Sequence, residues 1–508
     1  MLKLLIKIRR LLNRHLFLFL LPASTVPAAE LLSVDQQVWA DDYKLEAIGI
    51  SGDTYFPLQT VLRETGLDNL KQQLCPPEKI ETITEQLLDY YTSQGFAFSR
   101  VSIDKLLLDD SLKTVSLNLT FTLGSRVTVS FVTYDSLRSN RPEYLTRETR
   151  LQVPFIFDPQ KVTAAEQYLS SAELFNTYPI WQIVKNPVGN YGLNFTLAEE
   201  PYNSLDAVLG YSRGKGEDGE LLGRVEVAFR NLAGTLRQLK INWQRQSESE
   251  ELVELYYREP WVFSYPFALY GRFKQEFQDE NYLERSYGAG VDYQLDYRLT
   301  LLAEYTFTEI LPDSIMISRG SRKADKQIWT AGLNYKHFNR KREYFRSKLT
   351  LSTVLKQFRD SSTENGYLLH SFNEWQLNIG GPFYFRQQLR LEYTEADSLQ
   401  SYDLLKFGGH SSLRGYFEDQ YRSDFYLLNR NDLIWQAADN TELFVFGDAA
   451  GYNNTPGQKS ARRIDMLYGA GAGLRFNNKL GTFEISYGIA AAEGNETAKL
   501  HMQYINKF

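Results

Sequence analysis

From residue 204 to the end of this 508-residue chain, one segment after another alternates apolar and polar side chains with a period of two. In the segment 483–488, for example, Phe483, Ile485 and Tyr487 alternate with polar or small residues. Such alternation places the two kinds of side chain on opposite faces of a β-strand. About 300 residues of this pattern, without a helical segment, predict a large sheet with one apolar and one polar face.

A soluble β-sandwich would also alternate, with its apolar face turned toward a core. The length of the pattern and the 33 tyrosines and 31 phenylalanines, which recur near strand ends, favour a transmembrane barrel instead. In such a barrel the apolar face contacts lipid and the polar face lines a wet lumen, while closure removes exposed edges. Residues 203–508, at about 19 residues for each strand of about 9–11 residues and its connection, predict a transmembrane β-barrel of about 16 antiparallel strands.

The first 29 residues have the pattern of a secretory signal peptide. Five basic residues precede a short apolar core, LFLFLLPA at 16–23, and small residues at 26–29 offer a cleavage site. The core is too short for a transmembrane helix, although an N-terminal anchor helix remains an alternative. Removing this segment changes the net charge from −6 to about −11, because residues 1–28 carry five basic groups and no acid. An acidic exported chain is not expected to bind nucleic acid.

The residue types that carry bond chemistry are sparse. Cys75 is the only cysteine, so no internal disulfide can form, and the five histidines show no metal-ligand spacing. We find no paired nucleophile and base and no glycine loop that would cradle phosphate. The sequence therefore predicts no enzymatic activity, no cofactor and no metal site.

Residues 43–200 follow a different pattern, in which strands alternate with helices. A strand at 43–50 leads to helices at 57–66 and 76–95 and then to two further strands. The same order repeats over 126–200, so the pattern predicts two small α+β modules, at 43–125 and 126–200. The helix at 76–95 begins with proline and ends at glycine, and one stripe of it is apolar. This stripe consists of Ile80, Ile83, Leu87, Leu88 and Tyr91.

The segment YYTSQGFAFSRV joins that helix to the next strand, with Gly95 at the helix end and Phe96 and Phe98 in the strand. It resembles the corresponding part of a POTRA module. The resemblance implies two POTRA domains in series, although two small α+β domains of another kind remain an alternative.

A second resemblance comes from the segment GGHSSLRGY at 408–416. Together with the signal peptide, the POTRA-like modules and the barrel pattern, it is similar to the BamA/TamA outer-membrane assembly superfamily, which includes the two-partner secretion transporters. That superfamily carries an Arg-Gly-aromatic signature in its sixth extracellular loop, after two glycines. The matching residues here are Gly408, Gly409, Leu413, Arg414, Gly415 and Tyr416.

The superfamily has a second motif on a later strand, which FVFGDAAG at 444–451 resembles. Phe446 and Asp448 are two residues apart and share a face, and an aspartate avoids lipid, so both should point into the lumen. The resemblance implies that the loop folds back into the barrel and that Arg414 meets this pair. A guanidinium is always charged, and a carboxylate and an aromatic ring can both bind it. Asp432 is a further candidate partner; an exposed loop with a chance Arg-Gly-Tyr is the alternative.

By resemblance, such a protein inserts or translocates other proteins at a bacterial outer membrane, with its POTRA domains in the periplasm. Clients would add a strand to a POTRA sheet edge, and the barrel would open laterally between its first strand, about 204–213, and its last, about 499–508. Expected partners are unfolded outer-membrane or secreted proteins and outer-membrane lipid, with accessory lipoproteins or periplasmic chaperones as further candidates.

Three alternatives to this interpretation remain open. The first is a two-partner secretion transporter, because two POTRA modules are the number found in such transporters. These transporters usually carry a plug helix, however, for which the dozen residues before 43 are too few, so a short BamA/TamA-like member is favoured. A passive porin or receptor-like barrel would conduct steadily and would not depend on Arg414. A surface structural protein would not need the pairing of Arg414 with Asp448.

Overall fold

The computed structural model describes residues 42–507 with short gaps, and the signal peptide expected at 1–29 lies outside this range. The described residues form two compact units: one holds residues before 138 with 148–169 and 178–198, and the other holds the remainder. The positions within the range that are not described are 54, 172–174, 176–178, 200–201, 214–218, 248–249, 279–281, 319, 341–342, 458–462, 479–480 and 493–494.

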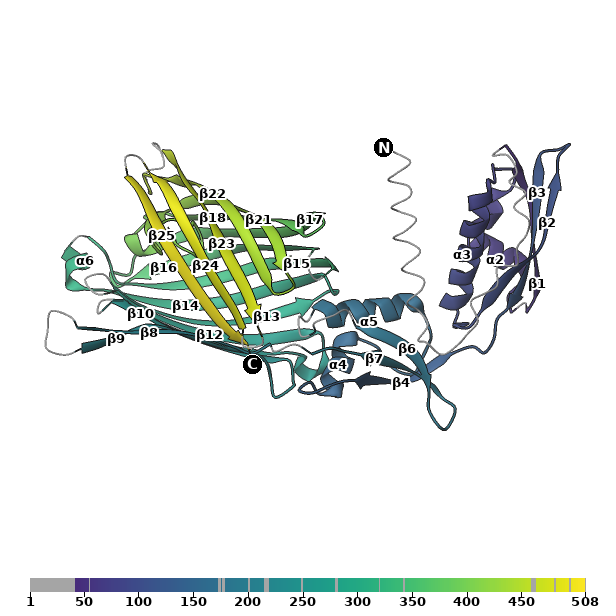
Figure 1. The fold of residues 1–508 in the computed structure, drawn as a ribbon. Coiled ribbons are helices and arrows are strands. Elements are labelled where there is room, and N and C mark those ends of the chain that lie inside the picture. The colour runs from purple at the N-terminus through teal and green to yellow at the C-terminus, as the bar shows by residue number, and fades with distance from the viewer. Residues whose placement is uncertain are drawn as a thin grey trace. The chain divides into compact units, whose positions relative to one another are not determined.

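The first module is a three-stranded sheet with helices on one face (Figure 1). The central strand β3 is parallel to β1 and antiparallel to β2, so β2 lies at an edge. Helix α3 buries Ile80, Ile83, Leu87 and Tyr91 in the core shared with the sheet, whereas Leu88, the fifth residue of the predicted stripe, is half-buried. The elements are β1 (Lys44–Gly52), α2 (Leu58–Glu64), the 3₁₀ helix η1 (Leu67–Leu70), α3 (Pro77–Ser93), β2 (Arg100–Asp109) and β3 (Thr114–Thr122).

The second module is a four-stranded sheet in the order β5-β4-β7-β6. Strands β4 and β7 are parallel, and β6 pairs antiparallel with β7 at an edge of the sheet. The elements are β4 (Thr128–Asp135), α4 (Pro142–Thr149), β5 (Phe155–Ile156), α5 (Pro159–Ser171), β6 (Ile180–Lys185) and β7 (Tyr191–Thr196).

Sixteen antiparallel strands of the described chain then form a closed barrel. This confirms the predicted fold class of α+β modules followed by an all-β barrel. The strands are β8 (Ser204–Arg213), β9 (Gly219–Leu232), β10 (Arg237–Ser247), β11 (Glu250–Glu259), β12 (Phe267–Gln278), β13 (Tyr282–Gln294), β14 (Leu299–Pro312), β15 (Ala324–Arg340), β16 (Glu343–Phe358), β17 (Thr363–Gly380), β18 (Phe383–Ala396), β21 (Phe425–Ala438), β22 (Thr441–Asn453), β23 (Ile464–Asn478), β24 (Gly481–Ala492) and β25 (Asn495–Lys507).

Strand β22 shows how the alternation distributes side chains between the two barrel faces. Leu443 and Val445 are exposed on the outer face, whereas Phe444, Phe446 and Asp448 are buried. Because lipid contacts the outer face and not the lumen, this pattern satisfies both environments at once. No described helix has the length and the apolar character needed to cross a membrane.

Two features of the barrel differ from the sequence-based expectation. Many strands exceed the 9–11 residues needed to cross a bilayer, and β17 reaches 18 residues. Pairing continues past the hydrocarbon layer because paired backbone groups remain satisfied there too. The barrel region also contains a short helix, α6 (Ser314–Ser318), between β14 and β15, and short 3₁₀ turns. Five residues are too few to show a helical period in the sequence.

The last and first strands close the barrel with little pairing. Strand β25 pairs with β24 from Asn495 to Asn506. With β8, within the described residues, it pairs only at Asn506↔Leu205 and Lys507↔Ser204. We call the junction of β8 and β25 the seam. Away from these two pairs, the facing edges of the described strands form no ladder across it.

Glu166 on α5 provides a test of the second module. Burial raises the pKa of its carboxyl to about 7. Because this value lies above that of an unfolded glutamate, the folded module favours the protonated acid, and the stability contributed by Glu166 is lost as pH rises toward and past 7. We expect hydrogen-exchange protection of α5 amides, corrected for intrinsic rates, to fall by about one to two orders of magnitude between pH 5 and pH 8.

The variant Glu166→Gln should flatten this dependence in the full chain, since an amide does not titrate. The control is Glu143→Gln, which removes an exposed acid on α4 and should leave the wild-type profile unchanged. A Glu166→Gln profile identical to wild type would contradict the assignment.

Candidate functional site: a loop held inside the barrel

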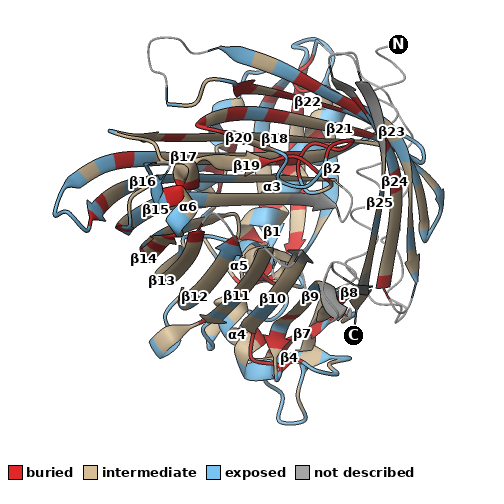
Figure 2. Cartoon of the chain, turned by 90° about the vertical axis from the view of Figure 1, so that its left-hand side faces the viewer, coloured by how far each residue is buried: buried red, intermediate tan, exposed pale blue. Residues whose placement is uncertain are grey.

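The long connection between β18 and β21, residues 397–424, lies inside the ring of strands (Figure 2). Its base is a two-stranded stem, and we call residues 408–420, beyond that stem, the loop tip. The elements of the connection are the 3₁₀ helix η3 (Ser401–Asp403), β19 (Leu405–Phe407) and β20 (Tyr421–Ser423).

Ion pairs fix the base of the loop to the barrel wall. Lys406 on β19 pairs with Glu276 on β12. Asp403 accepts a hydrogen bond from Lys356 Nζ on β16 at 2.6 Å, and Lys326 Nζ on β15 lies 2.7 Å from its other oxygen. The base of the loop is thus attached to β12, β15 and β16, whereas the tip is attached to β21 and β22.

Arg414 is the central residue of the loop tip, and it is 1% exposed. Its Nε donates to Asp448 Oδ2 at 2.8 Å and its Nη2 donates to Asp448 Oδ1 at 2.6 Å, which is a bidentate pair. Nη2 also lies 2.7 Å from Asp432 Oδ1. The backbone N–H of Arg414 donates to Asp448 as well. The guanidinium carbon lies 3.8 Å from the centre of the Phe446 ring, within cation–π range. The structure therefore brings together Arg414 and all three residues named as its partners.

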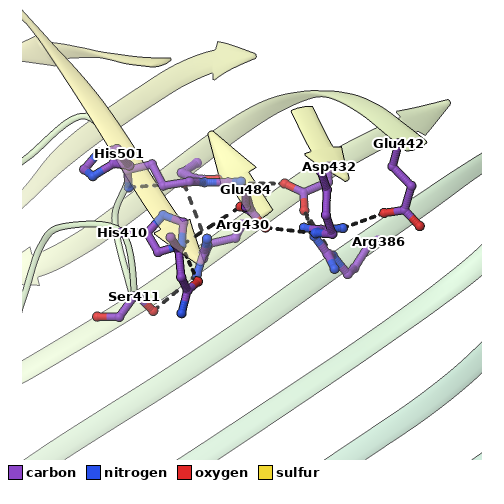
Figure 3. Close-up of polar contacts among 12 residues, drawn as sticks. Arg386, His410, Ser411, Arg430, Asp432, Glu442, Glu484 and His501 are labelled. Atoms are coloured by element: carbon purple, nitrogen blue, oxygen red, sulfur yellow. Dashed lines mark hydrogen bonds and ion pairs between the residues drawn. The ribbon is translucent and has the colours of Figure 1, made fainter. Parts of the chain in front are cut away.

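Two further arginines complete this charge cluster. Arg386 on β18 donates from Nε to Asp432 Oδ2 at 3.0 Å, and Figure 3 shows the two side chains pointing toward each other. Arg430 on β21 lies 3.8 Å from Asp448 and donates to the backbone carbonyl of Ser411 at 3.2 Å. Neither arginine was predicted from the sequence. Arg430 precedes Asp432 by two residues, so the shared strand face was the available signal.

Small residues allow the loop tip to lie directly on the wall. Gly415 has a φ of +96°, and a Cβ there would lie 3.0 Å from the backbone of Ala490 on β24. A Cβ on Gly469 of β23 would lie 2.1 Å from the carbonyl oxygen of Arg414. Any larger residue at either position would displace the tip and pull Arg414 away from its carboxylates. Gly408 and Gly409 begin the tip, and both also have positive φ values.

Apolar contacts surround the charged centre. Leu413 and Tyr416 are buried in one cluster with Phe407 on β19 and Tyr426 on β21. The Tyr416 hydroxyl donates to the backbone carbonyl of Tyr468 on β23 at 3.0 Å. This packing keeps water away from the ion pairs, which strengthens them.

The charge cluster binds the loop of the same chain, and its carboxylates are occupied by that binding. The carboxylates of Asp448 and Asp432 accept from arginines, and the described residues contain no group of three or more ligating side chains that could hold a metal. What the cluster controls is therefore whether the loop lies in the lumen.

A sixteen-stranded barrel with POTRA-like modules and a loop locked in its lumen defines a class of outer-membrane protein. A family model described as the Omp85 superfamily domain matches residues 231–505, more than half of the chain. The chain belongs to the Omp85 superfamily, whose members insert or transport proteins. A POTRA model, described as surface antigen variable number repeat, matches residues 43–124. Both matches confirm the resemblance drawn from the sequence.

Solved structures share this fold. BamA from Haemophilus ducreyi lacking POTRA domains 1–3 matches with a TM-score of 0.51 and 18% identity, over 92% of this chain and 100% of that chain. CdiB from Acinetobacter baumannii matches with a TM-score of 0.59 and 12% identity, over 99% and 98%. CdiB from Escherichia coli matches with a TM-score of 0.59 and 14% identity, over 98% and 97%. No curated protein matches the chain.

Trypsin can test the burial of Arg414, because the enzyme cleaves only after an accessible Arg or Lys. We expect the wild-type barrel in membranes to resist cleavage between Arg414 and Gly415. Asp448→Ala leaves the guanidinium without its bidentate partner, and breaking a buried pair costs about 3–5 kcal/mol, so cleavage should accelerate by about a hundredfold or more. New N-termini identified by mass spectrometry report the site.

Val445→Ala is the matched control, because Val445 lies on the same strand and faces outward. Cleavage after the exposed Arg359 normalises protease activity. Equal protection of Arg414 in wild type and Asp448→Ala would show that this pair does not hold the loop.

Proposed function

We propose that this protein inserts β-rich client proteins into the outer membrane, or exports them across it, through lateral opening of its seam. The observation that carries the proposal is the pairing of β25 with β8 through only two residue pairs of the described chain. Superfamily membership supports the general activity. Clients, accessory lipoproteins and periplasmic chaperones would be its protein partners.

The seam is suited to accept a strand. A backbone N–H or C=O facing lipid without a partner is costly, because the hydrocarbon layer supplies no hydrogen bonds. On β8 after Leu205, and on β25 before Asn506, the facing edges of the described strands present such groups. An incoming client strand would satisfy them, and pairing through the backbone tolerates many client sequences.

The POTRA-like modules offer an earlier binding place for the same kind of client. Strand β2 lies at the edge of the first sheet, where Ile103 and Leu107 are exposed. Strand β6 lies at the edge of the second sheet and exposes Ile180. An extended client segment could add to either edge by β-augmentation, with these apolar side chains contacting it.

Secretion through the lumen is the second candidate function. It is favoured by the presence of two POTRA-like sheets and by the match to CdiB over nearly the whole of both chains. In that case the loop inside the barrel would have to leave the lumen to clear a path. Lateral insertion requires the seam to open, whereas secretion requires the lumen to open.

Depletion of the protein in the organism that encodes it tests the general proposal. Quantitative mass spectrometry of the outer membrane and of the secreted fraction should show loss of particular β-rich proteins, which identifies the clients. Wild type should restore them, whereas Arg414→Ala and Asp448→Ala should not, because each variant breaks the buried pair. A proteome that does not change on depletion, or full restoration by both variants, would favour a passive porin or a structural role.

A disulfide across the seam separates the two modes. Leu205→Cys with Asn506→Cys, in a Cys75→Ala background, places two thiols at paired positions. We expect oxidation to block insertion of client barrels and reductant to restore it. Either single cysteine variant is the control for the substitutions themselves. If oxidised protein still secretes soluble clients, the lumen is the route; if it still inserts barrels, the seam is not the gate.

A further inference from the structure

The loop tip also contacts the last strand, at three successive inward positions. Lys499 Nζ lies 3.6 Å from the centre of the Phe417 ring. The Gly415 N–H donates to His501 Nε2 at 3.4 Å.

The third contact lies further down the strand, where His410 Nε2–H donates to Gln503 Oε1 at 3.3 Å. The rings of His410 and His501 are 5.6 Å apart, and Figure 3 shows both in the polar network beside Arg430 and Glu484. Every second residue of β25 from 499 to 503 thus touches the tip.

This part of β25 is the part that the seam leaves unpaired. The two pairs with β8 involve Asn506 and Lys507, which follow the three contact positions in the sequence. From 499 to 503, the described strand has β24 on one side and no ladder with β8 on the other. A strand held by one neighbour frays more readily than one held by two.

The tip itself is firmly held. Arg414 joins it to Asp432 on β21 and to Asp448 on β22. Both strands pair with neighbours on both sides. The tip therefore connects strands that are paired on both sides to a strand whose described residues 499–503 are paired on one side only.

We propose that the loop tip is a strap that holds β25 in place from the lumen, with His410, His501, Gln503 and Lys499 as its positioning residues. Seating of Arg414 closes the strap, and its release frees the upper part of β25. Loop seating and seam opening are then coupled through direct contacts. The consequence for clients rests on the proposed function, but the strap itself is a property of the barrel without any client.

Hydrogen exchange measured by mass spectrometry on the full chain in lipid nanodiscs tests the strap. We expect His410→Ala and His501→Ala to raise exchange in peptides covering 495–507 by about fivefold to tenfold, the factor that one or two lost hydrogen bonds imply. Peptides covering β21 and β22 should not change. Arg414→Ala should raise exchange in β25 as well, although Arg414 itself bonds to other strands.

Two variants distinguish a strap from mere packing. His410→Gln retains a side-chain N–H at a similar reach and should restore wild-type exchange. His370→Ala removes another histidine of the barrel, whose partner is Glu392 on β18, and should leave β25 unchanged. If either alanine variant fails to fold, the double variant Lys499→Ala/Gln503→Ala gives the same measurement without altering the loop.

The outcomes decide between the inferences. Unchanged exchange in β25 for the alanine variants and Arg414→Ala would overturn the strap. An equal rise in β21 and β22 would overturn it too, because the contacts would then support the whole barrel. If β25 responds as expected while depletion of the protein leaves the outer-membrane proteome intact, the strap stands and the proposed function fails.

Discussion

A guanidinium buried in the lumen is the interaction on which this architecture depends. Arg414 is almost fully enclosed, and a charge taken out of water is tolerated only when matched charges and hydrogen bonds replace the lost solvation. Asp448 supplies a planar acceptor, Asp432 a second acceptor and Phe446 the face of a ring. These requirements allow one position for the loop, so a flexible connection becomes a fixed part of the barrel interior.

The membrane imposes a second constraint, and the seam only partly satisfies it. A barrel spans lipid because closure gives every backbone group a partner. Here fifteen of the sixteen junctions of the described barrel are extended ladders, whereas the seam consists of two pairs. The seam is therefore the junction of the described barrel with the least stabilisation from backbone pairing. The three contacts between the loop tip and β25 compensate for part of that deficit.

The alternation of side chains and the length of the alternating region together predicted a barrel of about 16 strands, and the spacing of Phe446 and Asp448 was sufficient to orient both inward. Alternation gives the face of each residue but not which strands are neighbours, nor how a loop folds back across them. Arg386 was missed for this reason, since its partner Asp432 lies 46 positions away. The place of the seam was expected only from the family resemblance, and its weak pairing could not be read from the residues, because register depends on both strands together and neither sequence shows the lost pairing.

If the loop leaves the lumen, as the proposed secretion route would require, the surplus of positive charge around Arg414 limits the cost of its release. Removing a buried arginine usually leaves its carboxylate partners buried without a counter-charge, and that penalty would hold the loop in place permanently. In this barrel Asp432 keeps Arg386, and Asp448 keeps Arg430, after Arg414 has left. Asp448 loses the hydrogen bonds that it accepts from Arg414 but keeps the guanidinium of Arg430 3.8 Å away, so the electrostatic part of the loss is reduced. With three arginines around two aspartates, each carboxylate would still have a positively charged neighbour if Arg414 moved away.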